Sequence, residues 1–208
     1  MNKNKKKKIF FDLIPYFKNN SFSEHQLLKI LDKHNIKEDT FFYYFPEKIK
    51  SLSYYYFEII ANEAQNKVKE KLAKEKSISK RINILLIEYF ISLNNKDKIT
   101  IFFLNYLSIK PILFKKISLN YANGIWRILN DKSVDFNYYT KRFLLSQIFI
   151  NSTLYWRGAR DIEETIIFIN NQIQSIGKVG YYKTKLKTLF NSLTKKNCLS
   201  KFDLLHRN

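Results

Sequence analysis

Helix breakers are scarce in this chain, which has four glycines and three prolines in 208 residues. Average proteins contain about 7 % glycine and about 5 % proline, so this shortage favours long, uninterrupted helices. Apolar side chains recur at helical spacing along most of the chain, and no stretch keeps the alternation that is typical of a strand. The sequence therefore predicts an all-α fold. Helices are expected at about Lys5–Lys18, between Ser21 and Asn35, and at about Lys37–Tyr44, Pro46–Leu72, Ser77–Leu93, Lys96–Ser108, Pro111–Leu129, Phe136–Trp156, Asp161–Gly177 and Tyr181–Leu193.

The chain is strongly basic, with a net charge of +19 from 37 Lys and Arg residues against 18 Asp and Glu residues. Such a balance is typical of proteins that bind nucleic acid or an anionic membrane. Lysine, asparagine and isoleucine are all abundant, however, and their codons are AT-rich, so base composition explains the charge equally well. No window reaches the roughly 18 apolar residues of a membrane-spanning helix. We expect a cytoplasmic protein, peripheral on the inner face of the cytoplasmic membrane, or on the matrix side in a mitochondrion.

Residues that could carry catalysis are few and scattered. The histidines are His25, His34 and His206, and none belongs to a pair with the spacing of a zinc or di-iron site. Cys198 is the only cysteine, so the chain forms no intrachain disulfide. Phosphate-binding and nucleophile-elbow motifs are also missing. The sequence predicts a protein that is not an enzyme and uses neither a metal nor a cofactor, although a site built from distant carboxylates would leave no such pattern.

The N-terminal part of the chain has a helix-turn-helix layout, in which three helices precede a longer one. The run Thr40-Phe41-Phe42-Tyr43-Tyr44-Phe45-Pro46-Glu47-Lys48 resembles the stretch that ends the DNA-reading helix of TetR-family proteins. The resemblance implies a TetR-like fold, with a helix-turn-helix unit before an all-helical ligand-binding domain that forms a homodimer. Asn35, which tolerates the left-handed conformation, is expected to end the second helix. The reading helix begins with Glu38 and Asp39, which phosphate would repel, so nucleic-acid binding is not favoured.

A second segment is dense in rare residue types. Ile125-Trp126-Arg127 is followed by Asn130-Asp131-Lys132-Ser133-Val134-Asp135-Phe136-Asn137-Tyr138-Tyr139-Thr140-Lys141-Arg142. This arrangement resembles the signature of the COQ9 family, which has a tryptophan, then glycine-aspartate, then serine-threonine-aspartate-phenylalanine-asparagine-tryptophan-tyrosine-threonine, a basic residue and an arginine. The similarity continues through Ser152-Thr153-Leu154-Tyr155-Trp156. The chain departs from the family pattern at Asn130, Val134 and Tyr138, where the family has glycine, threonine and tryptophan.

The COQ9 resemblance implies a non-catalytic protein of ubiquinone biosynthesis. Such a protein would bind an isoprenoid or quinone lipid at the membrane and present the quinone precursor to the di-iron demethoxyubiquinone hydroxylase. The surface that binds this hydroxylase would comprise Ile125, Leu129, Asp135, Tyr138, Tyr139 and Arg142, of which Tyr138 and Arg142 are expected to be exposed.

The lipid pocket is expected among the helices Ile99–Ser108, Pro111–Leu129 and Phe143–Trp156. Its candidate lining residues are Phe103, Leu107, Phe114, Leu144, Ile148 and Tyr155. Helical periodicity does not separate a pocket wall from ordinary core, so this choice rests on the position of these residues alone.

The segment Tyr181–Leu193 projects as an amphipathic helix. Its apolar face at about 100° per residue comprises Tyr182, Leu186, Leu189, Phe190 and Leu193, with Lys183 and Lys185 at the edges. A face edged by lysines suits a helix that lies among lipid headgroups, and the COQ9 resemblance implies such a C-terminal helix. The alternative is a last helix that packs on the core or on a second copy of the chain.

Three regions are therefore expected: a helix-turn-helix-like unit over 1–50, a helical lipid-binding domain over 51–178, and an amphipathic membrane-associating helix with its tail over 179–208. The alternative function is that of a TetR-family transcriptional repressor, which would bind DNA and a small-molecule inducer.

Overall fold

The computed structural model describes residues 3–19, 22, 23, 25–132 and 135–175, with the backbone only at 135–137. The helices are α1 (Lys3–Lys18), α2 (Leu27–Lys33), α3 (Glu38–Tyr44), α4 (Ile49–Lys74), α5 (Ile78–Asn94), α6 (Asp97–Ser108), α7 (Pro111–Ile128) and α8 (Asp135–Ala159). A further helical segment runs over 162–175, and no strand occurs among these residues. The expected all-α, TetR-like fold is confirmed. Residues 1–169 form one compact unit and residues 170–208 a second.

The start of α4 differs from the prediction. Pro46 was expected in the first turn of this helix, but α4 begins at Ile49 and residues 46–48 form a turn. Lys48 has a φ of 49°, in the left-handed region, so the helix does not extend back through it. The turn leaves Phe45 completely buried, and burial of this ring explains why the chain bends here.

Two helices end at asparagines in the left-handed conformation. Asn35 has a φ of 52°, as the sequence predicts, and Asn130 has a φ of 53°. After α7, Asn130 N donates to Arg127 O and Asp131 N donates to Trp126 O, both at 3.0 Å. This is the Schellman pattern, in which glycine is the usual left-handed residue and asparagine the next choice. The departure of this chain from the glycine of the COQ9 pattern therefore keeps the backbone geometry.

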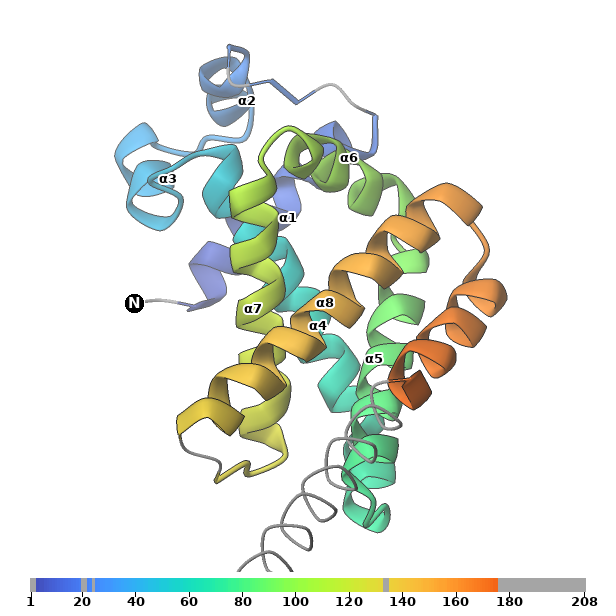
Figure 1. Cartoon of the computed structure of the whole chain (residues 1–208). Coiled ribbons are helices and arrows are strands. Elements are labelled where there is room, and N and C mark those ends of the chain that lie inside the picture. The colour runs from blue at the N-terminus through green and yellow to red at the C-terminus, as the bar shows by residue number, and fades with distance from the viewer. Residues whose placement is uncertain (1–2, 20–21, 24, 133–134, 176–208) are drawn as a thin grey trace, which may run out of the picture. The chain divides into compact units, whose positions relative to one another are not determined.

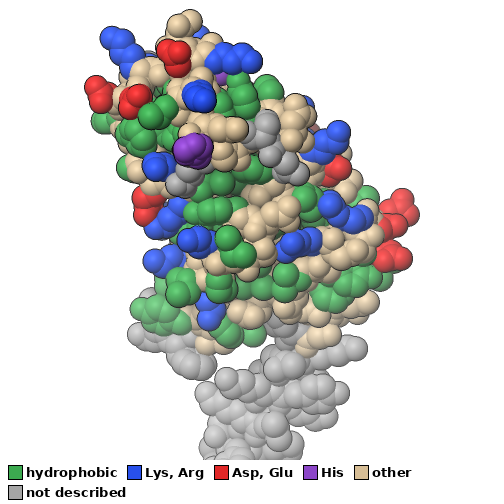
Figure 2. Space-filling view, turned by 90° about the horizontal axis from the view of Figure 1, so that it is seen from above, with side chains coloured by type: hydrophobic (Ala, Val, Ile, Leu, Met, Phe, Trp, Pro, Cys, Tyr) green, Lys and Arg blue, Asp and Glu red, His purple; other side chains and the backbone are tan. Residues whose placement is uncertain are grey.

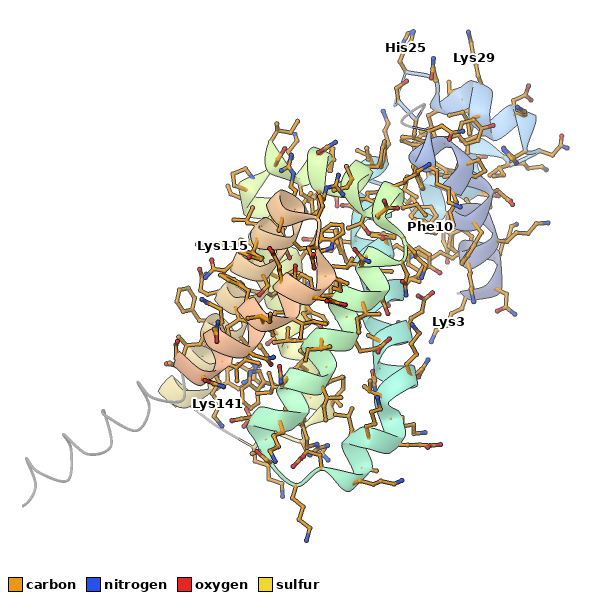
Figure 3. All side chains as sticks on the ribbon, turned by 90° about the vertical axis from the view of Figure 1, so that its right-hand side faces the viewer. Lys3, Phe10, His25, Lys29, Lys115 and Lys141 are labelled. Carbon is orange, nitrogen blue, oxygen red and sulfur yellow. The ribbon has the colours of Figure 1, made fainter. Side chains whose placement is uncertain are left out.

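The first helix, α1, packs on α4 and α6 through aromatic rings. The ring centroid of Phe17 lies 5.0 Å from that of Phe103 in α6, and Phe103 lies 4.9 Å from Tyr56 in α4. Figure 3 shows Phe10 on the side of α1 that faces the other helices of residues 1–169, whereas Lys29 of α2 projects outward. Burial of these large rings holds α1 against α4 and α6.

Two helix pairs form the body of residues 1–169. α4 packs along α5, α7 packs along α8, and α7 also contacts α4 and α6 (Figure 1). The centre is aromatic, since Tyr89 of α5, Tyr121 of α7 and Phe149 of α8 have ring centroids within 5.2 Å of one another. Trp156 Nε1 donates to Asn94 Oδ1 at 3.0 Å, which joins the end of α8 to the end of α5. α7 thus contacts α4 and α6 as well as α8, and it borders both cavities described below.

The basic side chains are spread over the face of the molecule that Figure 2 draws. Figure 2 shows Lys and Arg side chains scattered among hydrophobic and other side chains on one face. On that face the net charge of +19 is not organised as a single basic patch.

Candidate functional site

The turn between α7 and α8 is held by a buried carboxylate. The Asp131 side chain is 6 % exposed, Lys141 Nζ lies 2.8 Å from its Oδ1, and Arg142 Nη1 lies 3.2 Å from its Oδ2. Two cations from one turn of α8 thus neutralise the carboxylate that follows α7. A buried charge is stable only when it is paired in this way. This ion-pair cluster, Asp131 with Lys141 and Arg142, therefore fixes how α8 leaves the turn.

Arg142 is buried, with 7 % of its surface exposed, so the expectation that it is exposed is wrong. Its guanidinium donates to Tyr138 O at 3.0 Å, and its Cζ lies 3.3 Å from the centroid of the Tyr138 ring. The arginine is drawn inward because the Asp131 carboxylate lies beneath it. Arg142 packs against the Tyr138 ring and thereby holds that ring in position.

The remaining residues of the expected partner surface divide into buried and exposed sets. Ile125 in α7 and Leu129 directly after that helix are buried, at 1 % and 8 % exposure. Tyr138 is 37 % exposed and Tyr139 is 72 % exposed. Asp135 begins α8, and its side chain lies outside the described residues. Of the six predicted residues, the two tyrosines are those whose described side chains reach the surface.

Phe143, which the sequence analysis did not single out, extends this exposed surface. It is 51 % exposed and follows Tyr139 by four residues, so the two rings lie on the same face of α8. The spacing of four residues was a usable signal, but the sequence analysis placed Phe143 in a helix of the expected lipid pocket. We call Tyr138, Tyr139 and Phe143 the aromatic face of α8.

A small cavity lies where the lipid pocket was expected, among α6, α7 and α8. Its volume is about 240 Å³. The lining residues are Leu104, Leu107, Ser108, Pro111, Phe114, Ile150, Thr153, Leu154 and Arg157. The structure thus brings two of the candidate lining residues, Leu107 and Phe114, to one cavity.

The other candidate lining residues lie elsewhere. Phe103 is fully buried in the aromatic cluster with α1, and Ile148 is buried in α8. Leu144 is half-buried and lines neither this cavity nor the groove described next. The Tyr155 ring stacks on Phe168 with centroids 4.4 Å apart, and its hydroxyl bonds to Glu164 Oε2. Helical periodicity did not show which neighbours these four side chains would contact.

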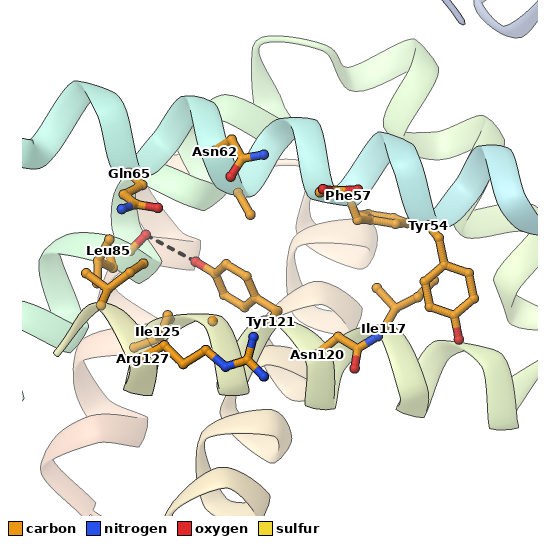
Figure 4. A pocket seen from close by; sticks show the side chains of 14 residues that line it. Tyr54, Phe57, Asn62, Gln65, Leu85, Ile117, Asn120, Tyr121, Ile125 and Arg127 are labelled. Carbon is orange, nitrogen blue, oxygen red and sulfur yellow. Dashed lines mark hydrogen bonds between the residues drawn. The ribbon is translucent and has the colours of Figure 1, made fainter. Parts of the chain in front are cut away.

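A larger groove, with a volume of about 440 Å³, lies between parts of α4 and α7 (Figure 4). Its lining residues are Tyr54, Phe57, Glu58, Ala61, Asn62, Gln65, Leu85, Ile117, Asn120, Tyr121, Gly124, Ile125, Arg127 and Ile128. The sequence analysis missed this groove, because α4 and α7 are far apart in sequence. The sequence offered one signal, Gly124 inside α7. Glycine in the interior of a helix lowers its stability relative to alanine, so such a glycine calls for another explanation.

The polar side chains of the groove are mostly neutral. Tyr121 Oη donates to Leu85 O at 3.3 Å across the inner end of the groove (Figure 4). Burial raises the pKa of the Tyr121 phenol well above its ordinary value of 10.0, so the hydroxyl stays a donor. Asn62, Gln65 and Asn120 add carboxamides, which both donate and accept hydrogen bonds. The groove can therefore hold a molecule that has an apolar body and a few neutral polar atoms.

Residues 114–180 match the COQ9 family model. The matched segment is about a third of the chain, and it is similar to the COQ9 family. No curated protein matches the chain. COQ9 is an accessory family rather than a known enzyme family, and it implies a role in ubiquinone biosynthesis. The segment matched to COQ9 includes most of α7, the ion-pair cluster and the aromatic face of α8, so one wall of each cavity belongs to it.

Among the described residues, no three His, Cys, Asp or Glu side chains stand close enough together to hold a metal ion. No helix in the described part of the chain is both long enough and apolar enough to cross a membrane. The predicted membrane-binding residues, Tyr182 to Leu193, lie outside the described residues.

Proposed function

We propose that this protein binds an isoprenoid quinone precursor and presents it to the di-iron hydroxylase of ubiquinone synthesis without catalysing a reaction itself. The observation that carries the proposal is the groove of about 440 Å³ between α4 and α7, of which the α7 wall belongs to the segment matched to COQ9. Ligand sites of this volume, with a mainly apolar lining and a few polar groups, are typical of small-molecule binding. The cavity among α6, α7 and α8 is a second, smaller place for an apolar chain.

The aromatic face of α8 supports a role in binding the hydroxylase. Tyr138, Tyr139 and Phe143 present three partly exposed rings, and the tyrosines also carry hydroxyls. Clusters of this kind, supported by a buried arginine, are common at the centre of protein interfaces. Ile125, Leu129 and Arg142 would support these rings from beneath rather than touch the partner directly.

Membrane association is proposed for the amphipathic segment 181–193, and a homodimer for the TetR-like domain. Lysines at the edge of an apolar face add about 1 kcal/mol each near an anionic leaflet. Removal of all residues after Ile176 is expected to abolish cosedimentation with liposomes that contain anionic lipid. Undiminished sedimentation of the truncated protein would rule out this role for the segment.

Native mass spectrometry with lipid extraction tests the ligand. Protein purified from a host that makes ubiquinone is expected to carry a quinone, a quinone precursor or an isoprenoid. A lipid-free protein that retards a specific DNA duplex would overturn the proposal and favour the TetR-type repressor instead. The exposed Glu38 and Asp39 at the start of α3 argue against that outcome, because they repel phosphate.

Copurification with the hydroxylase tests the partner surface. Replacement of both Tyr139 and Phe143 by alanine is expected to abolish capture of the hydroxylase. The matched control is Ile78→Ala with Ile167→Ala, which removes two comparably exposed apolar side chains that are not part of the aromatic face. Equal loss of capture in both double variants would contradict the assignment of the surface.

A further inference from the structure

The turn between α6 and α7 carries the two most exposed large apolar side chains of the described residues. Ile109, directly after α6, is 74 % exposed, and Ile112, in the first turn of α7, is 73 % exposed. Single exposed aliphatic residues are ordinary on a protein surface. Two of them, three residues apart at the tip of one turn, form an apolar projection that is better accommodated outside water.

The apolar surface of this turn continues into the smaller cavity. Ser108 and Pro111 belong to the turn, and both line the cavity among α6, α7 and α8. Leu154 of α8 is exposed and lines the same cavity. A third exposed aliphatic side chain and an apolar opening therefore adjoin the tip. Contiguous exposed apolar surface of this kind is typical of a contact with a membrane or another macromolecule.

The charges around the tip favour an anionic membrane over a protein partner. Lys110, Lys115 and Lys116 are exposed, and no Asp or Glu occurs between Lys98 and Asn130. The turn lies at the top of Figure 1 and so faces the viewer in Figure 2, where Asp and Glu side chains appear toward the edges of the molecule. Lysine is depleted at the centre of protein interfaces. At a membrane, its stem lies along apolar surface while its ammonium stays at the phosphates.

Polar groups of the turn are paired within it. Lys110 N donates to Leu107 O at 2.9 Å, and Ser108 Oγ donates to Asn105 O at 2.7 Å. Pro111 has no N–H to pair. A donor that leaves water without a partner is costly, so this internal pairing suits a turn that enters a lipid layer.

We propose that the α6–α7 turn is a membrane contact, which inserts Ile109 and Ile112 among the lipids of an anionic leaflet with the three lysines at its headgroups. The inference rests on the proposed membrane association, but it assigns a second contact to residues other than 181–193. One contact of this size gives weak, reversible binding, and two together give stable anchoring. The turn is therefore expected to strengthen the attachment made by the C-terminal segment, and not to replace it.

Cosedimentation of the full chain with vesicles tests the contact. The vesicles are an equal mixture of phosphatidylcholine and phosphatidylglycerol. Ile109→Asp with Ile112→Asp is expected to lower the partition constant at least about tenfold, because the apolar tip is lost and carboxylates face an anionic surface. Ile78→Asp with Ile167→Asp is the matched control, since it adds the same charge at exposed isoleucines of other elements and should leave the constant unchanged.

A fluorescent label on the turn reports insertion directly. Cys198→Ser removes the only cysteine, so Ile109→Cys in that chain gives one thiol for a nitrobenzoxadiazole label. Its emission is expected to shift to the blue when the same vesicles are added, because the label leaves water. The same label at Ile167→Cys should show no shift.

The outcomes separate this inference from the proposed function. A label at residue 109 that stays in water while the chain sediments with the vesicles would overturn the inference and leave the proposed role of residues 181–193 standing. A natural chain that does not sediment with the vesicles would contradict both. If the double aspartate variant keeps its vesicle affinity but loses a dimer in sedimentation velocity, the turn contacts a second copy of the chain and the inference is wrong.

Discussion

The two faces of α7 pack in opposite ways. Toward α8, the helix is closed: the Tyr121 ring lies 4.8 Å from Phe149, and Lys141 Nζ lies 5.0 Å above the Trp126 ring. Toward α4, the same helix leaves a groove of about 440 Å³, beside Gly124. Both faces carry apolar side chains, so hydrophobicity does not distinguish them. Side-chain size does, because large rings fill one interface and a glycine leaves the other open.

Phe149→Ala gives the strongest test of the closed face. The ring is fully buried among Tyr89, Phe90 and Tyr121, so its removal is expected to lower the free energy of unfolding by about 3–5 kcal/mol. Urea denaturation followed by circular dichroism measures the change. Phe143→Ala on the exposed face of α8 is the control and should cost below about 1 kcal/mol. Similar losses in the two variants would mean that the α7–α8 interface is not the tightly packed one.

Arg142→Ala tests the ion-pair cluster at the end of that face. It leaves the buried Asp131 carboxylate with one cation, and breaking a buried pair costs about 3 kcal/mol. Arg157→Ala removes an arginine whose hydrogen bond to Asn105 is exposed, so the expected loss is under about 1 kcal/mol. Thermal unfolding of both variants measures the contrast. An equally small effect at Arg142 would show that the turn does not depend on the pair.

Tyr121 touches both faces, and its phenol makes stability depend on pH. Tyr121→Phe loses the hydrogen bond to Leu85 O, which is expected to cost about 1 kcal/mol at pH 7. Burial raises the pKa of this phenol in the folded state, so its contribution is fully present below pH 10.0. As pH rises further, the unfolded chain loses the proton first and stability falls by about 1.4 kcal/mol per pH unit.

The difference between the natural chain and Tyr121→Phe should therefore shrink above pH 10.0, because the variant lacks this phenol. Urea midpoints measured from pH 8 to pH 11 give the comparison. A difference that stays constant over that range would contradict the raised pKa.

Gly124→Ala tests the open face with the smallest expected effect. A methyl group there meets nothing within 4 Å, so the variant is expected to be more stable by up to about 1 kcal/mol through reduced backbone freedom in the unfolded chain. Differential scanning calorimetry measures the rise in melting temperature, with Gly158→Ala as the control. A loss of stability would show that the space beside Gly124 is already occupied.

Much of the fold follows from local sequence patterns. Helical spacing of apolar residues and the scarcity of glycine and proline predict the helices, because these effects act within a few turns of one segment. Asn35 ends α2 in the left-handed conformation for the same local reason. The similarity to the COQ9 family was also predictable, because the residues that carry it lie in one continuous segment.

The sites depended on contacts between distant segments. Arg142 was expected at the surface, and only the position of Asp131 beneath α8 draws it inside. The groove required α4 and α7 to lie side by side, and no pattern in either helix gives the distance between them. The sequence by itself determined which residues form helices and that one segment is similar to the COQ9 family. Tertiary structure decided which helix each face meets and where space stays open, because packing depends on the sizes of side chains brought together from far along the chain.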